Sequence, residues 1–208
     1  MGTVAIVDYG VGNLKSVANA LSYLGCSSCI TADPAELERA DAIILPGVGA
    51  FPDAADRLRS GGLDQHVLAQ GQKKPGLGIC LGMQLLLEQG REVRPCPGLG
   101  VIRGTVDRIP TQSKLPHIGW NSLRFFHHSP LFRGLDEGAY VYFVHSFYGA
   151  NCAGSVIAKA EYGPAVTDYG PAVTAAVSSG NFYGTQFHPE KSGEVGLTIL
   201  RNFAGLNC

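Results

Sequence analysis

The sequence predicts an α/β fold with a central, mostly parallel sheet, helices on both of its faces and an antiparallel section. Up to Gly90, apolar strand-like runs alternate with helix-like segments, an order typical of parallel sheets covered on both faces. From Gly98 onward, shorter strand-like runs follow one another with turns between them, which indicates antiparallel strands. No linker or break in composition interrupts the chain, so we expect a single domain over residues 1–208.

The first strand–helix units come from the N-terminal third. Thr3–Val7 is a continuous apolar run, typical of a strand buried on both faces. Apolar residues at helical spacing then continue to Gly25, which ends the pattern. Asp41–Leu45 predicts a second strand, and two helical segments are expected after it, at Asp53–Ser60 and Leu63–Gln70.

The later elements complete the alternation and then change its character. Gly76–Ile79 predicts a strand that leads into a helix over Leu81–Gln89, closed by Gly90. The strands expected in the antiparallel section are Val101–Val106, Tyr140–Val144, Ser155–Ala160, Val173–Val177 and Phe182–Phe187. A last helix carries the apolar residues Val195, Leu197, Leu200 and Phe203 and should pack on the sheet.

The overall composition excludes several classes of function. The formal net charge is −1 and 45% of residues are hydrophobic, so nothing predicts binding to nucleic acid or to a membrane. No signal peptide or bilayer-spanning run is present, and six scattered cysteines suit a reducing compartment. We therefore expect a cytoplasmic protein. Cys26 and Cys29 form a C-x-x-C without a second ligand pair, so no metal site and no cofactor is predicted.

The segment Gly78-Ile79-Cys80-Leu81-Gly82 places a cysteine between two glycines, where a strand turns into a helix. This arrangement is a nucleophile elbow. The backbone of so tight a turn is strained, and the flanking glycines lack side chains that would clash there. The positive end of the following helix favours the thiolate of Cys80. By itself the pattern is also typical of a buried structural cysteine.

His188-Pro189-Glu190 follows the apolar run Phe182–Phe187 and so lies at the end of a strand, where α/β sheets gather catalytic groups. Because Pro189 restricts the intervening backbone, His188 can face Cys80 while Glu190 reaches the other ring nitrogen. The pattern predicts a triad in which His188 takes the thiol proton and later protonates the leaving group. Glu190 would hold the tautomer and stabilise the imidazolium.

Attack by a thiolate creates an oxyanion, which two convergent backbone N–H groups can stabilise. Leu81 can supply one of them from the start of the predicted helix. We assign the second to Gly49, in the Pro46–Gly49 loop at the end of another strand. No Gly-Lys-Ser/Thr follows this loop, so it does not predict a phosphate-binding loop.

Several motifs together resemble a known family. The class I glutamine amidotransferases are similar to this chain in the segments Gly78–Gln84, Leu45–Gly49 and Gln186–Ser192. More narrowly, the glutaminase subunits of imidazole glycerol phosphate synthase are similar over nearly the whole chain, including Asp8–Asn13, Pro116–Asn121 and Tyr142–Phe147.

This resemblance implies an activity and a partner. Cys80, His188 and Glu190 would hydrolyse glutamine to glutamate and ammonia through a cysteine thioester. The ammonia would pass to a (β/α)8-barrel cyclase subunit, bound as a heterodimer, that forms imidazole glycerol phosphate and an aminoimidazole carboxamide ribonucleotide in histidine biosynthesis. The resemblance also implies weak activity until the cyclase binds its own ligand.

The resemblance further assigns binding residues by matching positions. Glutamine would be held by Gly47, Gln84, Ser146 and Phe147. The cyclase interface would include Asn13, Trp120, Tyr142 and Lys191. A single tryptophan is more often a core residue, but an exposed Trp120 would suit a protein interface.

One segment departs from the family pattern. Residues 161–167, Glu-Tyr-Gly-Pro-Ala-Val-Thr, are followed at once by Asp-Tyr-Gly-Pro-Ala-Val-Thr at 168–174. Two copies of odd length cannot continue one ladder, because every side chain would change face. We expect a longer loop or a hairpin here, produced by a duplication.

Three other functions remain open from the sequence. The chain could serve another amidotransferase of the same class, although Pro116–Asn121 disfavours this. It could be a peptidase-like or esterase-like hydrolase, although Gln84 and the Gly47 loop suit glutamine. It could also be a non-catalytic regulatory subunit of the cyclase, which an intact triad disfavours.

Overall fold

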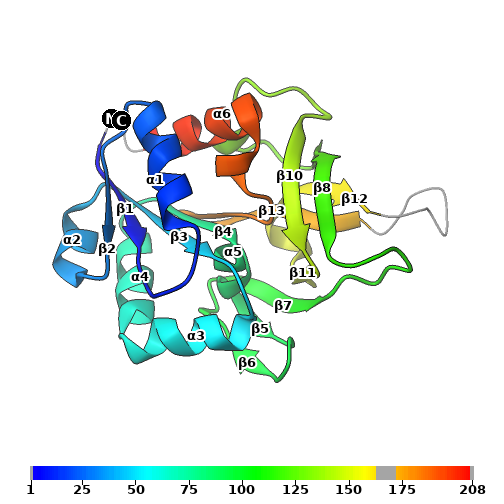
Figure 1. Cartoon of the computed structure of the whole chain (residues 1–208), viewed down its shortest axis with the longest axis horizontal. Coiled ribbons are helices and arrows are strands. Elements are labelled where there is room, and N and C mark those ends of the chain that lie inside the picture. Colours follow the sequence, from blue (N-terminus) through cyan, green and yellow to red (C-terminus); the bar gives the residue numbers. More distant parts are fainter. Residues whose placement is uncertain (1, 163–171, 207–208) are drawn as a thin grey trace.

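The computed structural model describes residues 2–162 and 172–206. Within these residues, eight strands form the main sheet, in the spatial order β2 (Ser28–Thr31), β1 (Val4–Val7), β3 (Ala42–Gly47), β4 (Gly76–Cys80), β14 (Phe182–Thr185), β13 (Ala172–Ser179), β12 (Val156–Glu161) and β9 (Arg124–Phe125). The first five run parallel and the pairs from β14 to β9 are antiparallel (Figure 1). The predicted parallel sheet with an antiparallel section is therefore confirmed.

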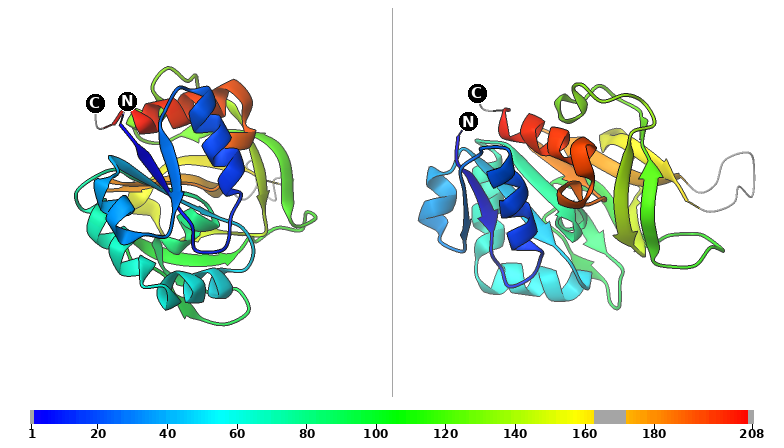
Figure 2. Two further views of the ribbon diagram at one scale, coloured as in Figure 1. Left: turned by 60° about the vertical axis from the view of Figure 1, so that its left-hand side comes forward. Right: turned by 45° about the horizontal axis from the view of Figure 1, so that its top comes forward.

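Each face of the parallel part has its own apolar core. Side chains alternate across a strand, so Val4 and Ile6 pack with α1 (Leu14–Tyr23) and α6 (Gly193–Ala204). The intervening β1 residues pack on the opposite face with α2 (Pro34–Arg39), α3 (Phe51–Ser60) and α4 (Leu63–Gly71). Figure 2 shows these two helical layers with the sheet between them.

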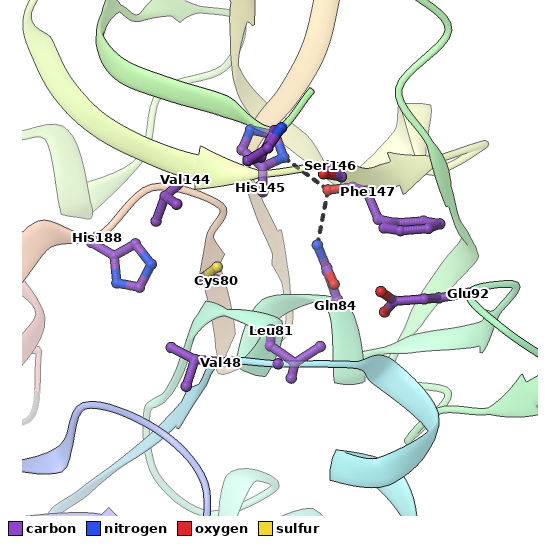
Figure 3. A pocket seen from close by; sticks show the side chains of 12 residues that line it. Val48, Cys80, Leu81, Gln84, Glu92, Val144, His145, Ser146, Phe147 and His188 are labelled. Atoms are coloured by element: carbon purple, nitrogen blue, oxygen red, sulfur yellow. Dashed lines mark hydrogen bonds between the residues drawn. The ribbon is translucent and has the colours of Figure 1, made fainter. Parts of the chain in front are cut away.

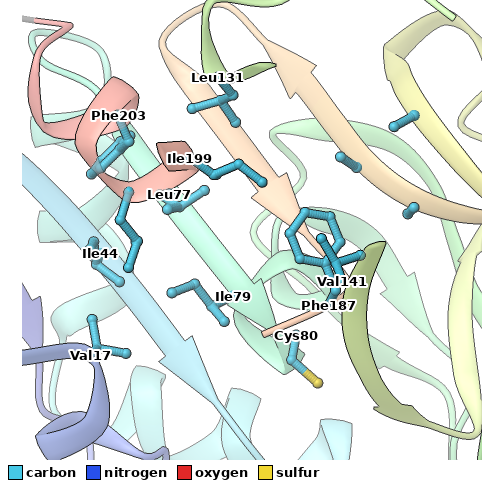
Figure 4. Packing of buried hydrophobic residues seen from close by; sticks show 14 of the residues in the cluster. Val17, Ile44, Leu77, Ile79, Cys80, Leu131, Val141, Phe187, Ile199 and Phe203 are labelled. Carbon is cyan, nitrogen blue, oxygen red and sulfur yellow. The ribbon is translucent and has the colours of Figure 1, made fainter. Parts of the chain in front are cut away.

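Helix α6 illustrates how the sequence pattern produces this packing. Its apolar residues recur at helical spacing, so Ile199, Leu200 and Phe203 are all fully buried. Figure 4 shows Ile199 and Phe203 above Leu77 and the neighbouring strands. Burying each such side chain contributes about 1.5–3 kcal/mol. The predicted last helix is confirmed.

Two smaller sheets lie beside the main one. In the first, β8 (His117–Ser122) pairs antiparallel with β10 (Tyr140–His145). The second has the order β11 (Phe147–Ala150), β7 (Ile102–Arg108), β5 (Leu87–Gly90) and β6 (Cys96–Pro97). Short 3₁₀ helices η1, η2 and η3 cover Pro130–Phe132, Ala153–Ser155 and Pro189–Lys191. No helix in the described ranges has the length and apolarity needed to cross a bilayer.

The predicted helix over Leu81–Gln89 is confirmed at its start and wrong after Leu85. Helix α5 covers Leu81–Leu85 only, and the chain continues as β5 from Leu87. Adjacent leucines satisfy both helical and extended patterns. Pairing of β5 with β6 and β7 decides between them, since it buries Leu87 fully. The strand predicted over Phe182–Phe187 also stops early, at Thr185.

The tandem repeat joins two paired strands. β12 and β13 are antiparallel, with Glu161 opposite Ala172, so the prediction of a hairpin is confirmed. The remainder of the predicted loop, residues 163–171, lies outside the described residues. The second copy supplies the beginning of β13, where the Thr174 hydroxyl donates to the Gly149 carbonyl at 2.7 Å.

Candidate active site

Cys80 stands at a strained turn between β4 and α5. Its φ of 54° lies in a region that non-glycine residues rarely adopt. A Cβ at Gly82 would overlap the Leu45 carbonyl oxygen, and one at Gly78 would lie 2.6 Å from the Gly82 carbonyl oxygen. The glycines thus permit a close approach of three backbone segments, and the strain is of the kind that clusters at functional sites.

Cys80 opens into a cavity of about 340 Å³, a size typical of small-molecule sites. Figure 3 shows the His188 ring next to the Cys80 sulfur, with Gln84 and Phe147 farther along the cavity. Among the residues proposed from the sequence, those that line the cavity are Gly49, Cys80, Leu81, Gln84, Ser146, Phe147 and His188. The structure therefore brings the predicted nucleophile, base and most substrate residues together.

The His188 ring is held from behind by Glu190. Nδ1 of His188 lies 2.8 Å from Glu190 Oε1, and the two side chains are only 2% and 1% exposed. Nε2 of His188 is on the side of Cys80 and has no hydrogen bond of standard geometry within the described chain. That atom is available to exchange a proton with the thiol or with a substrate, which is the geometry of a triad.

The electrostatics of His188 follow from these contacts. Burial by itself lowers the pKa of the imidazole, since it disfavours the charged ring. Interactions with the Cys80 and Glu190 side chains outweigh burial and raise the pKa of His188 from 6.5 to about 9. These contacts therefore favour the protonated, imidazolium form of His188 at neutral pH.

Val48 and Gly49, directly after β3, form another wall of the cavity. The predicted loop begins later than expected, because Pro46 and Gly47 still pair with Ile79 and Cys80 of β4. The Tyr9 hydroxyl donates to the Pro46 carbonyl at 2.6 Å and fixes the end of β3. Gly49 has φ of 97° and lines the cavity, together with Leu81. Gly47 is not among the lining residues. A Cβ there would meet Tyr9 and Leu81, so Gly47 allows the end of β3 to pack on α5.

Two glutamines link the cavity wall to the nucleophile. Gln84 Nε2 donates to the Phe147 carbonyl at 2.9 Å and contacts Gln186 Oε1 at 3.0 Å. Gln186 Nε2 in turn lies 3.7 Å from the Cys80 sulfur, at the limit for a hydrogen bond to sulfur. Sequence reasoning did not single out Gln186, although it lies in the quoted Gln-Phe-His-Pro-Glu segment.

Sequence reasoning also missed Glu92 and His145, which line the cavity. The Glu92 carboxylate accepts from the Phe51 backbone N–H at 2.8 Å, so α3 holds it in place. Figure 3 shows Glu92 and His145 among the side chains around the cavity. Glu92 lies among the charged residues Arg91 and Arg94, a context that resembles a solvated turn. The signal for His145 was its position in β10, where every second side chain is buried.

The four residues proposed for the partner interface lie on or next to α1, η3, β8 and β10. Trp120 is 56% exposed and makes an edge-to-face contact with Tyr142, at 6.1 Å between ring centroids. Asn13 precedes α1, and exposed Lys191 ends η3, which packs against both α1 and β10. Trp120 is therefore a surface residue and not part of the core.

Metal binding has no support in the described part of the chain. No group of three or more histidine, cysteine, aspartate or glutamate side chains converges there in a way that could hold an ion. Cys26 is buried and Cys29 is partly buried, and neither forms a disulfide.

Comparisons with known proteins agree with this geometry. The family model described as glutamine amidotransferase class-I matches residues 5–205, and the chain belongs to this family. Its curated relatives include the imidazole glycerol phosphate synthase subunit HisH of Bacillus cereus, 47% identical over 98% of this chain and 94% of the relative. The HisH subunit of Bacillus thuringiensis is 46% identical over 98% of this chain and 94% of the relative.

Within the class, the chain belongs to the HisH subunits, the glutaminase subunits of imidazole glycerol phosphate synthase in histidine biosynthesis. The predicted family and enzyme class are confirmed. A solved glutamine amidotransferase, 20% identical, has a TM-score of 0.74 over 98% of this chain and 99% of its own. PurLQS from Thermotoga maritima, also 20% identical, has a TM-score of 0.72 over 98% of both chains. These two likenesses confirm the fold.

Proposed function

We propose that this chain hydrolyses glutamine to glutamate and ammonia on Cys80, with His188 and Glu190 completing a triad. The observation that carries the proposal is the strained, glycine-flanked Cys80 sharing one cavity with a histidine whose other nitrogen is held by a buried carboxylate. Strain at the nucleophile and a raised histidine pKa are both features of catalytic sites.

The first half-reaction forms the thioester. The Cys80 thiolate attacks the side-chain amide carbon, so that a C–S bond forms and the carbonyl electrons move to oxygen. Backbone N–H groups of Leu81 and Gly49 would stabilise this oxyanion. The His188 imidazolium then gives its Nε2 proton to the amide nitrogen, the C–N bond breaks, and ammonia leaves. Glu190 stabilises the imidazolium throughout.

The second half-reaction regenerates the enzyme. Neutral His188 takes a proton from a water molecule, whose oxygen attacks the thioester carbon. A second oxyanion forms at the same donors and collapses, the C–S bond breaks, and glutamate leaves with Cys80 again a thiolate. One water is consumed for each glutamine, and His188 ends as the imidazolium with which it began.

The remaining cavity residues suit the other groups of glutamine. Glu92 contributes a carboxylate to the lining, which complements the α-ammonium group. Gln84, Ser146 and Phe147 supply amide, hydroxyl and backbone groups on the facing wall. Gly47 would not touch glutamine itself. It would act indirectly, because it lets the end of β3, just before the proposed oxyanion donor Gly49, lie against α5.

The proposal includes a partner. Free ammonia is largely protonated at neutral pH, so a glutaminase that serves a synthase is expected to transfer it internally. We assign the surface that carries Asn13, Trp120, Tyr142 and Lys191 to a cyclase subunit with a (β/α)8 barrel, bound as a heterodimer. This assignment is supported by the contact of Tyr142 with the triad, since the His188 backbone N–H donates to the Tyr142 carbonyl at 3.0 Å. The chain would act as a single domain in the cytoplasm, weakly active until the cyclase binds its ligand.

The experiment substitutes the nucleophile in the reconstituted pair of this chain and its cyclase. C80A should reduce glutamine-dependent synthesis by about 10⁴-fold or more, because the covalent step is lost. Ammonia-dependent synthesis should be unchanged, since it bypasses the cavity. The matched control is C29A, which changes a cysteine outside the cavity.

Survival of glutamine-dependent synthesis in C80A would show that the mechanism is wrong. Loss of the ammonia-dependent reaction as well would contradict the division of labour between the two subunits. Turnover of simple amides or esters at rates comparable with glutamine would instead favour a general hydrolase.

A further inference from the structure

Two buried histidines lie next to the catalytic cavity, His145 in its wall and His117 behind it, and the proposed mechanism uses neither. His117 on β8 and His145 on β10 stand directly opposite each other in the antiparallel pair. They are 3% and 6% exposed. Burying an imidazole is costly unless its nitrogens are hydrogen-bonded, so the partners of these four nitrogens decide what the pair does.

Hydrogen bonds connect the two rings in a defined order. Nδ1 of His145 lies 2.8 Å from the Phe147 carbonyl oxygen, and Nε2 of His145 lies 3.2 Å from Nδ1 of His117. Nε2 of His117 lies 3.4 Å from the side-chain nitrogen of Asn121. Burial lowers the pKa of both histidines to about 4, so both rings are neutral at physiological pH.

Neutral rings leave one arrangement of protons. The Phe147 carbonyl can only accept, so His145 carries its proton on Nδ1 and accepts at Nε2. His117 must then donate from Nδ1 and accept at Nε2, and Asn121 must present its amide hydrogens. Asn121 satisfies this requirement, because its oxygen already accepts from the Ser122 backbone N–H. The chain of donors therefore runs from Asn121 through both histidines to the Phe147 carbonyl.

The inner end of the chain reaches the substrate site. The Phe147 carbonyl also accepts from Gln84 Nε2 at 2.9 Å. Gln84 contacts Gln186, whose side-chain nitrogen is 3.7 Å from the Cys80 sulfur. Figure 3 shows the bond from His145 and the bond from Gln84 meeting at Phe147.

The outer end of the chain belongs to a strand with an exposed apolar face. Side chains alternate along β8, so His117 and Asn121 point inward while Ile118 and Trp120 point outward, 59% and 56% exposed. His117 is also packed between the aromatic rings of Phe143 and Tyr162, at 4.8 and 4.0 Å between centroids. A shift of β8 would therefore move His117 with it.

We propose that His117 and His145 are positioning residues that hold the Phe147 carbonyl, and through it Gln84, in the orientation that binds glutamine. Because His117 is on β8, the same pair ties this orientation to the strand that carries the exposed Trp120. The inference rests on the proposed function for its substrate. It adds a hydrogen-bonded connection between β8 and the wall of the cavity that carries Gln84.

The test compares variants of the two histidines in the reconstituted complex. H145L removes the donor to Phe147. H145N places an amide nitrogen near the position of Nδ1 and so retains a donor to the Phe147 carbonyl. H117F keeps the stacked ring but removes both of its hydrogen bonds. Y162F is the matched control, because it keeps the ring against His117 and loses only the hydroxyl bond to the Lys114 carbonyl.

For H145L we expect the KM for glutamine to rise about three- to tenfold, the effect of one buried hydrogen bond. Its kcat should change less than twofold, and H145N should recover most of the affinity. H117F should raise KM similarly, and H117F/H145L should cost little more than H145L alone, since one chain is broken in both. Ammonia-dependent synthesis and the KM of Y162F should match the unsubstituted complex.

An unchanged KM in H145L, with only a lower thermal stability, would show that the pair merely fills the core and would overturn the proposal. Additive effects of H117F and H145L would overturn the connection to β8. If H145L does not fold, the test compares the KM for glutamine of H117F with that of H145N. Equal KM values in these two variants would also overturn the proposal. C80A separates the hypotheses, because glutamine-dependent synthesis in C80A refutes the proposed function whatever the histidine variants do.

Discussion

The two sides of the catalytic cavity are built in different ways. On the Cys80 side, five consecutive residues form the turn, and steric exclusion at Gly78 and Gly82 holds it. On the other side, hydrogen bonds between separate segments hold His188. Its backbone N–H donates to the Tyr142 carbonyl at 3.0 Å, and Ser192 Oγ donates to the His188 carbonyl at 2.7 Å.

This difference determines how each side tolerates change. Repulsion between backbone atoms rises steeply, so the nucleophile side should not accept even one added methyl group. A hydrogen bond contributes only about 0.5–1.5 kcal/mol, so the histidine side can lose a contact and still fold. The histidine side also contacts β10, next to the proposed partner surface, and is therefore the side on which a bound partner can act.

The largest effect should come from adding a methyl group on the nucleophile side. In G82A, the new Cβ would overlap the Leu45 carbonyl, so β3 and α5 would have to separate. We expect the free energy of unfolding to fall by about 3 kcal/mol or more, measured by urea denaturation. The control is G154A, where a Cβ meets no atom within 4 Å and the change should stay within about 0.5 kcal/mol.

Equal stabilities of G82A and the unsubstituted chain would contradict the view that sterics hold the nucleophile side. So would a large loss in G154A, because general sensitivity to Gly→Ala changes would then explain both results.

The next effect concerns the hydrogen-bonded side. E190Q keeps the shape of the side chain but removes the charge that stabilises the His188 imidazolium. We expect the variant to fold and glutamine-dependent kcat to fall by about 10²- to 10⁴-fold, measured in steady state with the cyclase bound. E194Q, on the exposed first turn of α6, should retain full activity.

The same variant has a signature in pH dependence. Folding raises the pKa of His188 from 6.5 to about 9, so protonation of this ring stabilises the folded chain. That stabilisation is complete below pH 6.5 and is lost as the pH rises toward about 9. In E190Q the pKa of His188 should be lower and the loss smaller. The free energy of unfolding of both proteins would be measured by urea denaturation across this pH range. An equal decline in E190Q and in the unsubstituted chain would contradict the assignment.

The smallest effect should come from removing one copy of the tandem repeat between β12 and β13. Deleting 168–174 joins Thr167 to Ala175, so the Ala-Val-Thr of the first copy replaces that of the second at the start of β13. Glutaminase activity and complex formation should be unchanged. Stability should rise by no more than about 1 kcal/mol, because a shorter connection costs less entropy to close. Loss of activity or of complex formation would show that the duplication does more than lengthen the hairpin.

Site residues could be predicted from the sequence where the residues that position them are close in the chain. Cys80 and Leu81 are positioned by residues within two or three places of each other, so a short motif predicts them. The carboxylate of Glu92, in contrast, is held at the cavity by the backbone N–H of Phe51, 41 positions earlier. Nothing local to Glu92 indicates this contact, and the same holds for the bond between Gln84 and Gln186, which are 102 positions apart.

The predictability of the fold followed the same rule. Buried runs such as Thr3–Val7 predict strands correctly because hydrophobicity alone defines them. β8 was not predicted, because its inward residues include His117 and Asn121 while its outward residues Ile118 and Trp120 are apolar. This is the reverse of the usual alternation. Behind the strand, His145 and the Glu161 carbonyl supply hydrogen-bonding partners for His117 and Asn121, and the proposed partner would cover the apolar face in front.

The sequence by itself determined the α/β class, the elbow at Cys80 and the family, since each depends on hydrophobic period or on residues close together in the chain. Tertiary structure alone decided that Leu87–Gly90 is a strand, that Glu92 and His145 line the cavity, and that Trp120 is exposed. Pairing with distant strands and burial against distant side chains set these outcomes. Such long-range energies outweigh local preferences once the chain is folded.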